Sequence, residues 1–153
     1  MIRFRAAVHE DLLRDLAKRH NVQALVEICP ALPYREALAE MLGADALLLM
    51  QASNCNAQIP AKFYEYLRAG KPPLGLTDPA GDTAAAMRSA GLSDTARLDN
   101  APEIAQALQQ LLRELRLGQA ARPSLSAIQQ ASRTTRAQTL VQMLNKASSE
   151  KSP

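Results

Sequence analysis

The residues best suited to chemistry lie in one short segment, at the start of a helix expected to begin at Pro60. Lys62 lies in the first turn of this helix and Glu65 follows three residues later, so both lie on the same helix face. A helix N-terminus offers unpaired backbone N–H groups and positive potential, and Lys62 adds a charge, which suits a phosphate group. A carboxylate one turn further on is suited to accept hydrogen bonds from the two hydroxyls of a ribose. The alternative is that Lys62 and Glu65 form an ordinary surface ion pair.

Other catalytic templates are absent from the sequence. It contains no Gly-x-Gly-x-x-Gly segment, no phosphate-binding Gly-x4-Gly-Lys-Ser/Thr loop and no Gly-x-Ser-x-Gly elbow. His9 and His20 are interpreted as surface or helix-end residues. Cys29 and Cys55 have no His or Cys at metal-ligand spacing, so we expect no metal site, and they fit a reduced compartment.

Length and composition predict one globular domain. The chain has 153 residues, of which 47% are hydrophobic and 22% charged. No apolar run reaches the roughly 18 residues that span a bilayer, and the first residues do not form a secretory signal, so we expect a cytoplasmic location. Aromatic residues are only 3% of the chain and Trp is absent, which argues against nucleic acid as a partner.

Positive charge gathers at the C-terminal end. Residues 113–153 carry seven basic and two acidic side chains, whereas the remainder carries 11 basic and 13 acidic ones. Basic side chains on C-terminal helices usually form a solvated helical face. The alternative is a surface that docks on a partner domain or on an anionic membrane, which would place the chain at the inner face of the membrane.

Short apolar runs alternate with helical patterns, which predicts an α/β fold. We expect a single three-layer Rossmann-like domain over 1–153, with a short parallel sheet, C-terminal helices in 118–153 and the run 46–50 as the central strand. In such sheets, ligands bind at the carboxyl ends of the strands, where the strand order reverses. The loops that follow the predicted strands are therefore the expected site, at 29–33, 51–59 and 77–81.

The segment Ile-Pro-Ala-Lys-Phe-Tyr-Glu-Tyr-Leu-Arg-Ala-Gly-Lys-Pro at 59–72 resembles the donor-binding helix of group 1 retaining glycosyltransferases, which have two Rossmann-like domains (the GT-B architecture). The resemblance runs from about residue 20 to 146 and includes segments at 32–38, 44–49, 104–112 and 132–144. It implies transfer of a hexose from a nucleoside diphosphate sugar, without a metal or other cofactor, in polysaccharide or glycoconjugate biosynthesis.

The resemblance also implies roles for individual residues. Glu65 matches the second of two family glutamates and would hold the ribose, and Lys62 would lie near the diphosphate or the ribose. The first glutamate falls at Ala57, so backbone groups of 56–58 would take its place beside the sugar. No catalytic residue is assigned. The expected substrate-binding residues are Pro33, Tyr34, Asn56, Ala57, Gln58, Ile59, Pro60, Lys62 and Glu65.

The Gly-rich turn and the acceptor domain of that family have no counterpart in this sequence. We therefore expect the donor-binding, C-terminal half of a glycosyltransferase, which needs an N-terminal acceptor domain as its partner and is inactive alone. The face that the acceptor domain would cover favours self-association. The alternative is a non-enzymatic, flavodoxin-like α/β binding or regulatory module. A nucleic-acid-binding domain that uses the basic tail is a weaker alternative.

Overall fold

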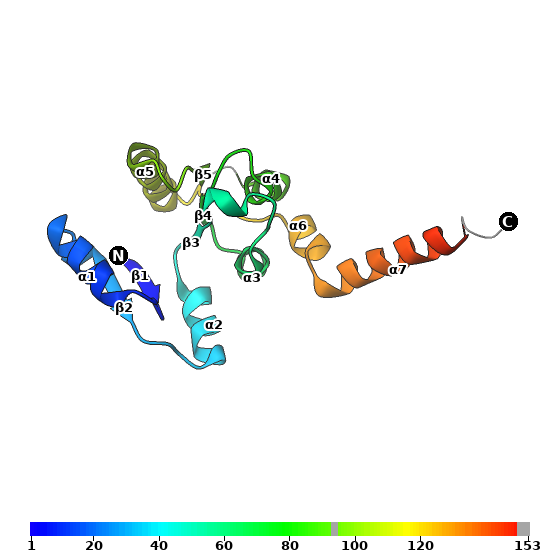
Figure 1. Cartoon of the computed structure of the whole chain (residues 1–153), viewed down its shortest axis with the longest axis horizontal. Helices are drawn as coiled ribbons and strands as arrows, with labels where there is room; N and C mark the ends of the chain where they lie inside the picture. Colours follow the sequence, from blue (N-terminus) through cyan, green and yellow to red (C-terminus); the bar gives the residue numbers. More distant parts are fainter. Residues whose placement is uncertain (93–94, 150–153) are drawn as a thin grey trace. The chain divides into compact units, whose positions relative to one another are not determined.

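The computed structural model describes residues 1–92 and 95–149, and its chain forms two compact units, Met1–Gly43 and Ala44–Pro153 (Figure 1). The sequence analysis expected one domain over this length. Both units combine helices with parallel strands, so the predicted α/β class is confirmed. None of the helices in the described part has both the length and the apolar character needed to cross a bilayer.

The first unit is a parallel strand pair with two helices. Phe4 lies opposite Ile28 in the strand ladder. Arg3 forms ion pairs with Glu27 (2.6 Å) and Glu40 (3.2 Å), and Arg5 also pairs with Glu40, so the first strand is bonded to the second helix. The elements are β1 (Ile2–Arg5), α1 (Glu10–Arg19), a 3-10 turn η1 (Gln23–Leu25), β2 (Val26–Cys29) and α2 (Tyr34–Gly43).

The second unit is a three-stranded parallel sheet with helices on both faces. The strand order is β3-β4-β5, and each strand is followed by a helix. The elements are β3 (Leu47–Met50), a 3-10 turn η2 (Ser53–Cys55), α3 (Ala61–Ala69), β4 (Pro73–Leu76), α4 (Asp82–Ser89), β5 (Thr95–Ala96), α5 (Ala101–Leu117), α6 (Leu125–Gln130) and α7 (Arg133–Ser149).

Residues on opposite faces of this sheet belong to different clusters. Leu49 packs with Phe63 of α3 and Met87 of α4. On the other face, Leu74 packs with Leu111 of α5. Because neighbouring residues of a strand point to opposite faces, the apolar run of β3 and β4 supplies both layers. The predicted three-layer arrangement is therefore confirmed within this unit.

The predicted order of the strands was wrong. Residues 46–50 were expected at the centre, but β3 lies at one end of the three-stranded sheet and β4 lies in the middle. All four residues of β4 are buried, whereas Met50 at the end of β3 is 51% exposed. A run of apolar residues indicates that a strand is buried, but it does not indicate where the strand lies in the sheet. The order β3-β4-β5 follows the chain without a reversal, so these described strands lack the reversal point at which a ligand site was expected.

Several helix ends are formed by residue types typical of those positions. Gly70 and Gly118 adopt left-handed conformations (φ 64° and 67°) after α3 and α5. The Asn100 side chain accepts a hydrogen bond from the Glu103 N–H (3.2 Å) at the start of α5. At the start of α4, Gly81 is the N-cap and no side chain caps the helix.

Candidate functional site

The candidate site is formed by the two loops that leave the carboxyl ends of β3 and β4. These loops span residues 51–60 and 77–81, and both belong to the Ala44–Pro153 unit. They are bonded to each other, since the Asn56 side chain donates to Asp78 Oδ2 (2.7 Å). The third expected loop, at 29–33, belongs to the other unit.

A buried polar pair holds the longer loop. The Gln51 side-chain amide donates to the carbonyl oxygens of Cys55 (2.8 Å) and Gln58 (2.7 Å). The Thr83 hydroxyl bonds to Gln51 Oε1 and lies 3.0 Å from the Gln58 carbonyl oxygen. Gln51 is 9% exposed and Thr83 is fully buried. The sequence analysis missed this pair, because its members are 32 residues apart and each resembles an ordinary loop or cap residue.

The second loop is held around Asp78. One carboxylate oxygen accepts from Asn56 and the other accepts from the Ala80 N–H (2.9 Å). The Asn56 carbonyl accepts from the Asp82 N–H (2.8 Å) at the start of α4. The backbone N–H of Ala80 and then the Asn56 amide lower the pKa of Asp78, because both donors favour the charged form.

Asp78→Ala should therefore lower the free energy of unfolding at neutral pH, and the loss should depend on pH. A carboxyl whose folded-state pKa is depressed contributes stability above its unfolded-state pKa, and this is lost as the pH falls through the folded-state pKa. The gap between native protein and variant should thus close in acid. Urea unfolding of both proteins along an acid pH series measures it. A gap that stays constant into strong acid would contradict a role for the ionised carboxylate.

Helix α3 begins with the arrangement that the sequence predicts. Pro60 is the extended N-cap (φ −64°, ψ 142°), and no side chain caps the helix. Lys62 Nζ lies 3.0 Å from Glu65 Oε2, and the two side chains are 66% and 46% exposed. The two charged groups therefore share one face at the open end of α3. As an exposed pair they contribute little to stability, typically about 0–1 kcal/mol.

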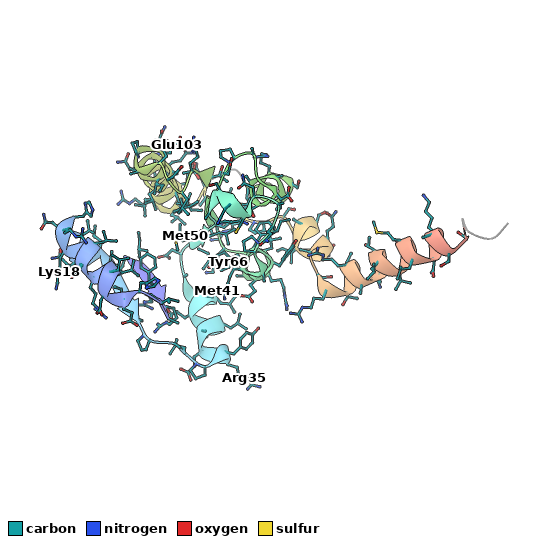
Figure 2. The ribbon with its side chains drawn as sticks, in the orientation of Figure 1. Lys18, Arg35, Met41, Met50, Tyr66 and Glu103 are labelled. Atoms are coloured by element: carbon teal, nitrogen blue, oxygen red, sulfur yellow. The ribbon has the colours of Figure 1, made fainter. Side chains whose placement is uncertain are left out.

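Aromatic residues of α3 attach the helix to its neighbours. Tyr66 is labelled in Figure 2. Its hydroxyl donates to the Leu48 carbonyl of β3 (3.3 Å), and burial raises the pKa of Tyr66. The Arg136 guanidinium lies 4.6 Å from the centre of the Tyr64 ring, which joins the start of α7 to α3. The face with Lys62 and Glu65 is therefore part of a helix that is bonded to the sheet and to the tail.

The structure brings together the predicted residues of 56–65, but it changes what their backbone offers. The carbonyl groups of Asn56 and Gln58 already accept hydrogen bonds within the protein, and Gln58 also donates its N–H to Cys55. Ala57 is exposed, whereas Ile59 packs against the cluster of α3 and α4. Fewer groups of this loop are therefore available to contact a ligand than the sequence predicts.

The remaining predicted residues lie in the Met1–Gly43 unit. Pro33 precedes α2 and accepts from the Ala37 N–H (3.0 Å), and Tyr34, the first residue of α2, is 76% exposed. Within residues 1–92 and 95–149, no group of three His, Cys, Asp or Glu side chains is placed to hold a metal ion. Cys29 and Cys55 are both free thiols.

The chain was compared with family models, with curated proteins and with solved structures. None of these comparisons returned a match.

Proposed function

We propose that this chain is the nucleotide-sugar-binding half of a retaining glycosyltransferase. The observation that supports the proposal best is the open start of α3, which presents Lys62 and Glu65 on one exposed face. The preceding loop is fixed by buried hydrogen bonds, which favours a preformed site. The sequence resemblance over 59–72 supplies the identity of the ligand.

In this proposal the diphosphate binds at the N-terminus of α3, near the Lys62 ammonium. One helical turn rises about 5.4 Å, which is a suitable offset between a phosphate and the ribose to which it is attached. Glu65 would then accept hydrogen bonds from the two ribose hydroxyls. Glu65 Oε2 pairs with Lys62, and in this proposal the second carboxylate oxygen accepts from the ribose while that pair is kept.

The chemical role of the site is to stabilise the leaving diphosphate. As the bond between the sugar and the phosphate breaks, negative charge grows on the diphosphate oxygens. The aligned backbone dipoles of α3 and the Lys62 charge would stabilise that charge. The protein's own groups would take this role without a cofactor.

The partner in this proposal is an acceptor domain, because sugar transfer needs both substrates in a closed cleft. An apolar stripe on α7 supports the presence of such a partner, since its large side chains are exposed. The exposed residues are Leu140 (57%), Val141 (55%), Met143 (65%) and Leu144 (58%).

The isolated chain should therefore bind donor but transfer no sugar. Half of the cleft would be missing, and both substrate positioning and water exclusion depend on its closure. The measurement is release of nucleoside diphosphate from UDP-, GDP- and ADP-hexoses with simple sugar acceptors, compared with buffer alone. Sustained turnover by residues 1–153 would contradict the requirement for a second domain.

A further inference from the structure

The buried pair formed by Gln51 and Thr83 joins the loop after β3 to the start of α4. We infer that these two side chains are positioning residues, which hold residues 51–60 in the one conformation that orients the start of α3. The restraint on the loop follows from the contacts alone, whereas its role in nucleotide binding rests on the proposed function.

Both the nitrogen and the oxygen of the Gln51 side-chain amide form hydrogen bonds. Its two N–H groups donate to the carbonyl oxygens of Cys55 and Gln58, and its Oε1 bonds to the Thr83 hydroxyl. Cys55 and Gln58 are the first and last residues of a turn that is closed by the bond from the Gln58 N–H to the Cys55 carbonyl. A single side chain, that of Gln51, therefore bonds to both ends of this turn. Most residues between Gln51 and Gln58 are small and exposed, namely those at 52–54 and 57. Hydrogen bonds, more than apolar packing, therefore hold this loop.

Thr83 has a hydroxyl where an apolar side chain would otherwise fit. The residue is fully buried, and its neighbour Ala84 and the nearby Met87 are also fully buried. A buried hydroxyl is costly unless it is hydrogen-bonded, so a threonine here is explained by the bond it makes. Its partners are Gln51 Oε1 and the Gln58 carbonyl oxygen, both on the loop.

Gln58 transmits this restraint to the candidate site. Its carbonyl oxygen accepts from Gln51 and lies within hydrogen-bond distance of Thr83, and Pro60, the N-cap of α3, follows two residues later. The proline ring restricts the backbone at the N-cap, and Ile59 packs against the cluster of α3 and α4. A shift of Gln58 would therefore move the first turn of α3, which carries Lys62. Even a displacement of about 1 Å in a binding site weakens contacts with a ligand, so the position of this turn matters for binding.

Thr83→Val tests the inference, because valine has nearly the same shape and lacks the hydroxyl. Amide hydrogen exchange over residues 51–59 should become about threefold to tenfold faster than in the native chain, the effect of losing one neutral hydrogen bond. Thr83→Ser keeps the hydroxyl and should exchange at the native rate. Thr139→Val, on the exposed side of α7 where the hydroxyl bonds only to its own helix, is the matched control.

Titration with uridine, guanosine and adenosine diphosphates gives the second measurement. The Kd of the diphosphate that binds should rise about threefold to tenfold in Thr83→Val and stay native in Thr83→Ser. If Thr83→Val is too unstable to study, Gln51→Met replaces it. That variant removes both amide donors and should increase loop exchange further.

The outcomes separate this inference from the proposed function. Loop exchange that is equal in native protein, Thr83→Val and Gln51→Met would overturn the inference, whether or not a nucleotide binds. Faster exchange with an unchanged Kd would overturn the positioning role in binding. Faster exchange in a protein whose native form binds none of the three diphosphates would contradict the proposed function and leave the role of the pair in the loop confirmed.

Discussion

Leu74→Asp should abolish cooperative folding of the Ala44–Pro153 unit. Leu74 lies on the middle strand of the three-stranded sheet and is 1% exposed. It belongs to the core cluster that also contains Leu76 of the same strand and Leu111 of α5. An unpaired carboxylate in such a place costs several kcal/mol beyond the lost apolar contacts, against a total stability of about 5–15 kcal/mol for a typical domain. Circular dichroism and urea unfolding measure the result.

Leu125→Asp is the matched control for that substitution. Leu125 is 79% exposed at the first position of α6, where an acidic side chain is tolerated or favourable. The free energy of unfolding of the control should equal that of the native chain to within about 0.5 kcal/mol. A Leu74→Asp protein that keeps a cooperative transition close to the native one would contradict the central place of β4.

The features that the sequence predicts well are those set by neighbouring residues. Gly70 and Gly118 end helices because a left-handed conformation is cheap for glycine, and Asn100 with Glu103 caps α5 within one turn. The pairing of Lys62 with Glu65 follows in the same way from helix geometry. Each of these depends on residues at most four positions apart.

The features that the sequence analysis missed depend on distant residues. The strand at Ile2–Arg5 alternates apolar residues with arginines, but with four residues this local pattern is short, and the partners of its arginines, Glu27 and Glu40, lie far along the chain. The order of β3 and β4 depends on how whole strands pair. The bond between Gln51 and Thr83 joins two loops that no local pattern connects.

Glu65→Gln should weaken nucleoside diphosphate binding by about tenfold to a hundredfold and leave the fold intact. Removing one charged hydrogen-bond partner typically costs about 1.5–3 kcal/mol. The side chain is 46% exposed and its ion pair with Lys62 is a surface contact, so the free energy of unfolding should change by less than about 1 kcal/mol. Glu114→Gln is the control, because Glu114 is another helical glutamate with a neighbouring side-chain bond, to Gln110, and it lies far along the chain from the candidate site.

A double-mutant cycle separates a ribose contact from a general effect of charge. A 2′,3′-dideoxynucleoside diphosphate lacks both hydroxyls, so the native chain should bind it about tenfold to a hundredfold more weakly than the parent nucleotide. Glu65→Gln should show little further loss with that ligand, because both changes remove the same interaction. Losses that simply add would indicate that Glu65 acts elsewhere.

Titration calorimetry of the native chain and of Glu65→Gln with uridine, guanosine and adenosine diphosphates tests the central claim most directly. We predict that the native chain binds at least one of the three and that Glu65→Gln binds it about tenfold to a hundredfold more weakly. Equal affinity of the two proteins would show that Lys62 and Glu65 form only a surface ion pair. No binding of any of the three by the native chain would contradict a nucleotide-sugar site at the start of α3.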